Sequence, residues 1–360
     1  MATAPALVSL ATRQQVMLER LKAGDIKKLE AFLKDAAKVI RERLAREELT
    51  TLARARAESQ LAAITSDLRV IYGGAAKQIQ SDLLDLAEYS AAAEARALGG
   101  VLVADTTLAV PSAAQVMAAA TARPLGNGKT AKMLEPFINE WVTGSIDKVD
   151  NAIRLGFFQG KTNREIISEV VGTASNKYKD GLIDATYRNA ETVVRTAVQH
   201  VAQVARSEMW EQNKDIIEAY EWVSVLDNRT TQQCQSLSGR VFEMGKGPLP
   251  PLHPNCRSAA VPVISNKYIR DTLRKGATQA SKGAAGGEQV AANLTYFDWL
   301  KTQPAAFQDE AIGPVRGKLF RDGGISAERF AELSLGKNFE PLTLDQMRAL
   351  EPVAFERAGL

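Results

Sequence analysis

The sequence predicts a mainly α protein: an elongated helical chain with one small antiparallel β unit around a Cys/His loop. Two observations predict the helices. Apolar residues recur at steps of three and four over long stretches, and alanine-rich runs accompany an aromatic content of only 6%. A third observation predicts the β unit, because residues 219–265 contain short alternating, β-rich segments. At 360 residues the chain is long enough for two or three domains.

Residues 1–110 are expected to form an N-terminal helical region. Its clearest apolar stripe repeats at helical spacing through Ile26, Leu29, Leu33, Ala36, Ile40 and Leu44. Basic residues surround this stripe: Lys27, Lys28, Lys34, Lys38, Arg41 and Arg43. We interpret them as a solvated face of a bundle helix. A second helical stretch is expected to break at Gly73-Gly74 and to resume through residues 79–89.

Residues 111–266 are expected to form a domain of helices followed by the β unit. Helices are predicted over 130–215, and Thr162 with Glu165 makes a capping box that starts one of them. His200 lies on a packed helix, where a lone histidine is usually a core residue, so we assign it no chemistry. The three predicted strands cover residues 219–227, 239–244 and 258–264.

The last part of the chain is predicted to be a linker and a small helical region. Residues 267–293 are expected to form a flexible linker, because 275–289 are rich in Gly, Ala, Ser and Lys. Such a linker would be the preferred site of proteolysis. Residues 294–360 are expected to form short helices, with turns at Gly313-Pro314 and Gly323-Gly324.

Composition and charge exclude several classes of protein. The formal net charge of +3 is too small to indicate a nucleic-acid binder by itself. The N-terminus has no basic region before an apolar stretch, which argues against a secretory signal. No apolar run approaches the roughly 18 residues of a membrane-spanning helix. Two cysteines without a signal indicate a reducing compartment, where a structural disulfide is a poor default.

Both cysteines and one of the two histidines lie in a single stretch of the chain, residues 227–257. Thiolate and imidazole are ligands that zinc prefers, and structural zinc takes four ligands in a tetrahedron. We therefore predict that Cys234, His253 and Cys256 bind zinc, with Asp227 as the candidate fourth ligand. Two alternatives remain open: the cysteines pack as small hydrophobic side chains, or they form a disulfide once the protein leaves a reducing cell.

The same residues do not predict an enzyme. Zinc deaminases carry a glutamate two residues after the histidine, whereas His253 is followed by Pro254 and Asn255. A Cys234–His253 nucleophile pair lacks a recognisable orienting residue and oxyanion hole. Glycine-rich phosphate-binding loops are also absent from the sequence.

Two ordered motifs in this region resemble a known family. The first, D-x-R-T-x-x-x-C-x-x-L-x-G, consists of Asp227, Arg229, Thr230, Cys234, Leu237 and Gly239. The second, P-P-L-H-P-N-C-R-S, contains Pro250, Pro251, His253, Pro254, Cys256, Arg257 and Ser258. Together with Arg195-Thr196 and Glu221-Trp222-Val223, they resemble the signature of the phage Mu F-like minor head proteins, over roughly residues 155–265. Many members carry a further cysteine after the R-T pair, where this chain has Thr231.

The stretch 296–324 is similar to a C-terminal segment of many phage head proteins of this type. Its aromatic and aliphatic anchors are Tyr296, Trp299, Leu300, Phe307 and Phe320. Such residues suit either a protein–protein contact or the core of a small helical unit. Both interpretations are compatible with the sequence.

The resemblance implies a structural minor head protein of a tailed phage, with no reaction of its own. It implies head or procapsid assembly at or near the portal, several copies per particle, a virion location and synthesis in the host cytoplasm. The implied partners are the portal, other head proteins and packaged DNA, met through the basic N-terminal helices, and no membrane. Deletion of residues 1–60 is then expected to leave the motif domain folded but to abolish incorporation into heads. The alternative is an enzyme of toxin or transferase type attached to a phage head domain.

Overall fold

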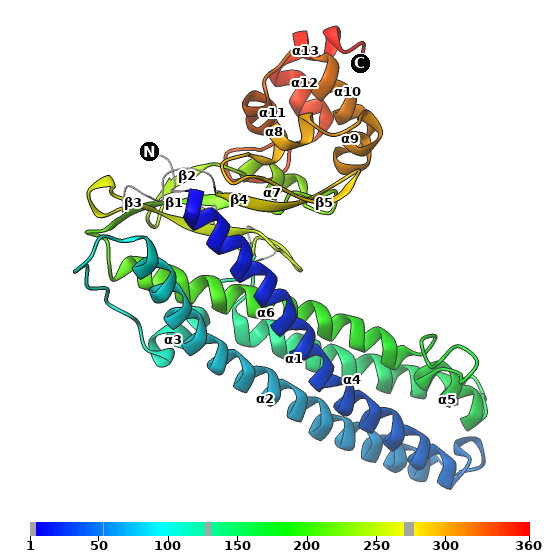
Figure 1. Ribbon diagram of the computed structural model, residues 1–360. Helices are drawn as coiled ribbons and strands as arrows, with labels where there is room; N and C mark the ends of the chain where they lie inside the picture. Colours follow the sequence, from blue (N-terminus) through cyan, green and yellow to red (C-terminus); the bar gives the residue numbers. More distant parts are fainter. Residues whose placement is uncertain (1–4, 53, 127–130, 270–276) are drawn as a thin grey trace.

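The computed structural model describes residues 5–52, 54–126, 131–269 and 277–360, and it is elongated (Figure 1). A bundle of long helices forms one end, a small sheet lies in the middle, and a unit of short helices forms the other end. The predicted fold class, mainly α with a small antiparallel β unit near a Cys/His cluster, is confirmed. Within the described residues, no helix is long and apolar enough to cross a membrane.

The long helices pack side by side around a continuous apolar core. They are α1 (Pro5–Arg46), α2 (Arg54–Val101), α3 (Ala113–Ala122), α4 (Leu134–Phe158), α5 (Asn163–Val171) and α6 (Leu182–Glu211), with a short 3-10 turn, η1 (Leu49–Thr51), between the first two. The whole predicted stripe from Ile26 to Leu44 is buried in this core. The predicted capping box of Thr162 and Glu165 starts α5, which confirms the helix start.

The predicted break at Gly73-Gly74 is wrong, because α2 continues through both glycines. A glycine inside a helix costs about 1 kcal/mol relative to alanine, and tertiary packing can outweigh that cost. A Cβ added at Gly74 would lie 3.1 Å from Cε1 of Phe32. The glycine therefore allows α1 to approach α2 closely.

The predicted boundary near residue 110 does not separate two cores. Helices from both predicted regions contribute to one hydrophobic cluster, which includes Leu33 of α1, Leu68 of α2, Val149 of α4 and Val198 of α6. The expectation that residues 1–60 can be deleted without loss of fold conflicts with this packing. Removal of α1 would expose apolar faces of α2 and α6 to water.

The β unit is a three-stranded antiparallel sheet in the order β2-β1-β3. Its strands are β1 (Ile217–Val223), β2 (Val241–Glu243) and β3 (Ala259–Ile264). The predicted first strand was placed two residues late and is too long at its end, because the chain leaves the sheet after Val223. Tyr220 and Val261 pack with Trp210 at the end of α6. This contact fixes the sheet on the bundle.

The predicted flexible linker at 267–293 is wrong where the structure describes it. Beyond the 3-10 turn η3 (Asn266–Tyr268), β4 (Thr278–Gly283) and β5 (Gly286–Ala291) form an antiparallel hairpin. Its segment 270–276 lies outside the described residues. Backbone hydrogen bonds, rather than apolar burial, build the hairpin, and the backbone N–H of Lys282 also donates to the carbonyl of Leu226. A polar, glycine-rich composition therefore did not exclude strands here.

The C-terminal region is a unit of short helices, as predicted. It contains α8 (Tyr296–Lys301), α9 (Ala305–Ile312), α10 (Pro314–Asp322), α11 (Ala327–Leu333), α12 (Leu344–Leu350) and α13 (Pro352–Arg357). The anchors Tyr296, Trp299, Leu300, Phe307 and Phe320 are all buried in its core. Of the two interpretations of these anchors, the core of a small helical unit is therefore correct.

Candidate metal centre

The sequence His253-Pro254-Asn255-Cys256 encodes a tight turn. The backbone N–H of Cys256 donates to the carbonyl of His253 at 3.2 Å, which closes the turn. Proline fixes φ at the second position, and Asn255 takes a φ of 59° at the third, the combination of a type II turn. Asparagine tolerates this left-handed conformation better than most residues. The turn holds His253 and Cys256 three positions apart at its two ends.

The third member of the cluster comes from a short helix, α7 (Gln232–Leu237). Thr231 is its N-cap, and the Thr231 hydroxyl accepts a hydrogen bond from the backbone N–H of Cys234. The loop before the helix is organised by Asp227, whose Oδ1 accepts from the Thr230 hydroxyl at 2.9 Å and from the backbone N–H of Arg229 at 3.1 Å. The D-x-R-T motif therefore shapes the loop that presents Cys234.

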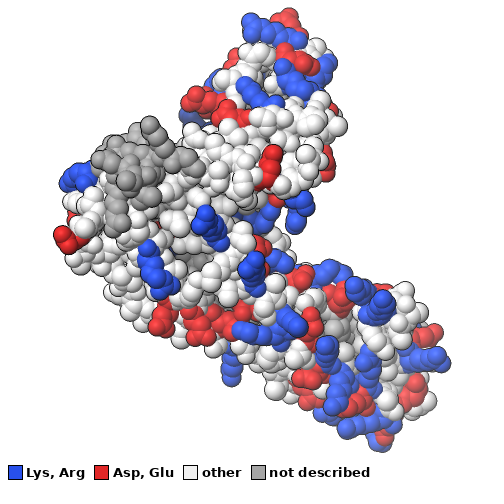
Figure 2. All heavy atoms as spheres, viewed as in Figure 1, with Lys and Arg blue, Asp and Glu red and all other residues white. Residues whose placement is uncertain are grey.

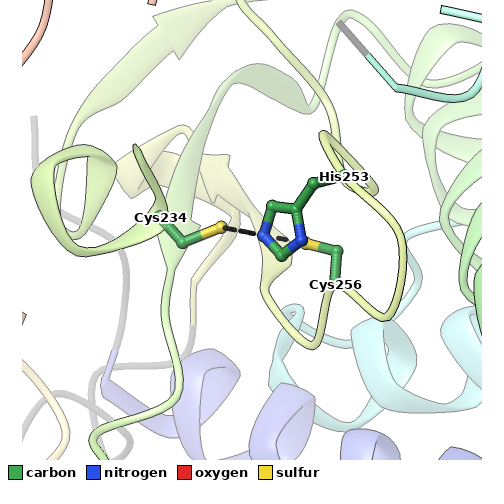
Figure 3. Close-up of side chains that lie close together, drawn as sticks. All are labelled: Cys234, His253 and Cys256. Atoms are coloured by element: carbon green, nitrogen blue, oxygen red, sulfur yellow. Dashed lines mark hydrogen bonds between the residues drawn. The ribbon is translucent and has the colours of Figure 1, made fainter. Parts of the chain in front are cut away.

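The structure brings Cys234, His253 and Cys256 together, and their side chains point toward one another (Figure 3). Sγ of Cys234 lies 3.2 Å from Nε2 of His253 and 3.8 Å from Sγ of Cys256. All three ligand atoms lie within 4.8 Å of one another. Both cysteines are free thiols and are buried, whereas His253 is half-buried.

These separations fit the donor geometry of a tetrahedral zinc ion. Two thiolates at about 2.3 Å from one zinc, separated by the tetrahedral angle, lie about 3.8 Å apart. This equals the observed separation of the two sulfurs. A thiolate and an imidazole nitrogen on the same ion lie about 3.5 Å apart, close to the observed 3.2 Å between Cys234 and His253. The two soft sulfurs and one imidazole are also the donor types that zinc prefers.

The electrostatics of the cluster favour a thiolate on Cys256. A hydrogen bond from Cys234 lowers the pKa of Cys256 well below its ordinary value, with burial opposing and His253 assisting. The same hydrogen bond, together with burial, raises the pKa of Cys234. Burial alone would lower the pKa of His253, but the hydrogen bond and charge of Cys256 reverse this and raise it. The thiolate is the form of cysteine that binds metals.

Asp227, the predicted fourth ligand, lies outside the group of Cys234, His253 and Cys256, and its carboxylate is paired with another residue. Its carboxylate accepts two hydrogen bonds from Arg257, at 2.7 and 3.0 Å, in a fork-shaped ion pair. Burial alone would raise the pKa of Asp227, but the hydrogen bonds and charge of Arg257 outweigh it and lower the pKa. Arg257 thus holds a carboxylate beside the loop.

Polar side chains on α6 dock the loop, and the sequence analysis did not identify them as a group. The Thr196 hydroxyl accepts from the backbone N–H of Asn255 at 3.1 Å, and Nε2 of Gln199 donates to the carbonyl of Ser258 at 2.8 Å. Gln203 accepts from the backbone N–H of Ala260 at 3.1 Å. The signal was present, because Thr196, Gln199 and Gln203 lie three and four positions apart on an otherwise apolar helix.

The cluster joins two parts of the molecule. Cys234 lies on α7, which contacts α8 and α11 of the C-terminal unit, and Gln235 of α7 donates to the Tyr296 hydroxyl at 3.1 Å. His253 and Cys256 lie on the loop that rests on α6 of the bundle. A metal ion held by all three residues would therefore link the C-terminal unit to the bundle.

His200 takes no part in the cluster, as expected. It is 3% exposed, and its Nε2 lies 2.8 Å from the backbone carbonyl of Ala120, which links α6 to α3. Burial lowers the pKa of His200, so the ring is kept neutral in the core.

The region that contains the cluster is similar to a known protein family. Residues 147–261 match the family described as Phage Mu protein F like protein. The matched range begins within α4, includes all three cluster residues and ends within β3. No curated protein and no solved structure matches the chain. Residues 147–261 are thus similar to the Phage Mu protein F like family, whose members are associated with phage head morphogenesis.

Proposed function

We propose that this protein is a structural minor head protein of a tailed phage that takes part in head or procapsid assembly at or near the portal. The similarity of residues 147–261 to a family of phage head morphogenesis supports this proposal. In this role the protein is made in the host cytoplasm, enters the virion head in several copies and acts by binding other proteins rather than by catalysis.

The environment of the Cys/His cluster supports a role without catalysis. Cys234 and Cys256 are 2% and 0% exposed, so neither sulfur is open to a substrate. The pocket beside them has a volume of only about 20 Å³. A cavity of about 10–15 Å³ already corresponds to one water molecule, so an organic substrate does not fit there.

Mass spectrometry of purified procapsids and mature particles tests the head assignment. We expect peptides of this protein in at least one of the two particle types, in a fixed ratio to the portal protein. Absence from both, in lysates where the protein is abundant, would rule out the structural role.

The alternative that the protein is an enzyme is tested by comparing the hydrolase and transferase activities of the wild type and Cys234→Ala. A variant that still enters particles but loses such an activity would favour an enzyme.

For the contact with the portal or a neighbouring head protein, we propose an apolar strip formed by Met17, Leu21 and Tyr89. These side chains are 42%, 37% and 38% exposed, and the Tyr89 hydroxyl lies 3.0 Å from the sulfur of Met17 across α1 and α2. Leu21 follows Met17 by one helical turn. Exposed apolar groups that adjoin in this way are typical of protein–protein contacts.

A pair of surface variants tests this strip. Leu21→Glu should lower the amount of protein incorporated into heads by roughly tenfold, because it places a charge in an apolar interface. Val70→Glu is the control, since Val70 is 75% exposed on the same helix pair but is not part of the strip. Equal incorporation of both variants would exclude the strip as the contact.

A contact with packaged DNA is supported best at a groove between α1 and the loop before α6. The groove has a volume of about 520 Å³, and its charged lining consists of four basic residues, Lys34, Arg41, Lys177 and Lys179, and two acidic ones, Glu30 and Asp184. Figure 2 shows acidic and basic side chains intermixed over the bundle, so the overall charge does not mark a DNA surface.

The double variant Lys177→Glu with Lys179→Glu tests this groove. It should weaken DNA binding and reduce the salt dependence of that binding, both measured by fluorescence anisotropy. If the double variant bound DNA with the affinity of the wild type, this groove would not be a DNA contact.

A further inference from the structure

The Cys/His cluster supplies three donors, and Thr231 lies beside the position of a fourth. The Thr231 hydroxyl oxygen is 3.0 Å from Nε2 of His253, the nitrogen that also faces Cys234. Thr231 is exposed, whereas the two sulfurs are buried. The side of the cluster occupied by Thr231 is therefore the side that faces solvent.

A small pocket opens at this side of the cluster. It has a volume of about 20 Å³, and its lining includes Thr231, Cys234, His253, Asn255 and Ser258. This volume suits one water molecule, which needs about 10–15 Å³. The lining offers hydroxyl groups and an imidazole, so a solvent molecule there would have hydrogen-bond partners.

We propose that Cys234, His253 and Cys256 bind one zinc ion, and that a solvent molecule beside Thr231 is its fourth ligand. The protein then holds zinc by two thiolates and one imidazole, in a site with one exchangeable position. A neutral threonine hydroxyl is not among the usual zinc ligands, which are thiolate, imidazole and carboxylate. Thr231 holds the solvent molecule by a hydrogen bond.

The carboxylate of Asp227, on the loop before α7, is not available for the fourth position. Asp227 is 5% exposed, and its two oxygens are engaged by Arg257 and Thr230. Moving it to a metal would leave the Arg257 guanidinium without its partner, which is costly for a half-buried charge. The exchangeable position consequently suits small ligands from solution: water, or a small anion such as azide.

The first measurement is the metal content of the full chain, purified without chelators. We expect about one equivalent of zinc per chain, with X-ray absorption showing two sulfur ligands at about 2.3 Å and nitrogen or oxygen ligands at about 2.0–2.1 Å. Less than about half an equivalent, with no uptake when zinc is added, would overturn the metal site. The result is independent of the proposed head function, because it requires only the purified protein.

The second measurement tests the solvent position by cobalt substitution. Four-coordinate cobalt absorbs strongly in the visible range, and each thiolate ligand adds charge-transfer absorption in the near ultraviolet. Azide should shift the visible bands of the wild-type protein, because it replaces the solvent ligand. Thr231→Cys should gain charge-transfer absorption, lose the response to azide, and bind zinc roughly tenfold or more tightly, equal to about 1.4 kcal/mol.

Thr231→Ala is the matched control, because it removes the same N-cap as Thr231→Cys but adds no thiol. It should respond to azide and retain zinc affinity within a fewfold range. A wild-type spectrum that does not respond to azide, or a large loss of zinc affinity in Thr231→Ala, would show that the protein supplies all four ligands. Either result would overturn the solvent position, whatever the metal content.

Discussion

At the scale of single residues, two pairs connect the same two segments of chain. Cys234 meets Cys256, and Asp227 meets Arg257, so a charged brace lies beside the cysteine contact. Asp227 and Arg257 have 7% and 24% of their side-chain surfaces exposed, respectively. Because a partly buried charge that loses its partner is poorly compensated, removing one member of this pair should destabilise the fold far more than removing one member of an exposed ion pair.

The variant Asp227→Asn tests the brace. We expect it to lower the free energy of unfolding by about 3 kcal/mol near neutral pH, because Arg257 loses its counter-charge. Asp309→Asn is the control: Asp309 pairs with Arg321 at 2.7 Å but is 34% exposed, so its loss should cost less than about 1 kcal/mol. Urea denaturation measures both. Equal losses of unfolding free energy in the two variants would show that burial does not make the Asp227–Arg257 pair more important for stability.

The effect of Asp227→Asn should depend on pH. Arg257 lowers the pKa of Asp227 in the folded protein, so the carboxylate contributes stability that is present above its unfolded pKa. That contribution is lost as the pH falls through the folded pKa. The difference between wild type and variant should therefore shrink in acid, when urea denaturation is repeated at successively lower pH. If the difference in the free energy of unfolding between wild type and variant stayed constant with pH, the charge of Asp227 would not be the cause of the stabilisation.

At the scale of elements, the hairpin of β4 and β5 shows how a polar, glycine-rich segment becomes ordered. Gly286 takes a φ of 107° where the hairpin turns, a conformation that residues with a Cβ rarely adopt. Gln279 is 4% exposed and donates to the carbonyls of Ala292 and Leu294, which ties the hairpin to the chain that follows it. The hairpin is thus stabilised by its glycine turn and by the hydrogen bonds of one buried amide side chain, instead of by an apolar core.

Gly286→Val should destabilise the hairpin by about 1–3 kcal/mol, because valine must adopt the strained positive φ. Hydrogen exchange should then show faster exchange of the amides in 278–291, with little change in α1 or α6. Gly287→Ala is the control, because its backbone is ordinary and an added Cβ would meet only the carbonyl oxygen of Ser281, at 3.9 Å. Unchanged protection in Gly286→Val would mean that the turn does not limit hairpin stability.

At the scale of the whole molecule, α1 contacts both the other helices of the bundle and the strands. It contacts α2, α5, α6, β3 and β4, so it connects the helical core to both sheets. Its buried side chains run from Leu7 near the sheet to Leu44 at the far end. The N-terminal helix is therefore a structural member of the fold, and only its outer face is free to meet a partner.

Deletion of residues 1–60 should consequently unfold the bundle. We expect loss of a cooperative thermal transition and a large loss of helical circular dichroism beyond that of the missing residues. Leu29→Ala, at a position 1% exposed, is a milder test and should cost about 2–5 kcal/mol, whereas Leu21→Ala, at 37% exposure, should cost much less. A soluble truncated protein with a sharp transition would show that α2 to α6 fold alone.

The sequence by itself determined the fold class, the capping box of α5, the C-terminal helical unit and three members of the cluster. These features depend on local patterns: helical periodicity, turn chemistry at His253-Pro254-Asn255-Cys256, and the few residue types that bind zinc. The tertiary structure alone decided the continuous path of α2 through its glycines, the hairpin in the predicted linker and the pairing of Asp227 with Arg257. Each depends on a partner distant in sequence: Phe32 beside Gly74, Leu226 beside Lys282, and a guanidinium thirty positions after the carboxylate. Local patterns specify which conformations a segment favours, whereas long-range contacts decide which of them is stabilised in the folded molecule.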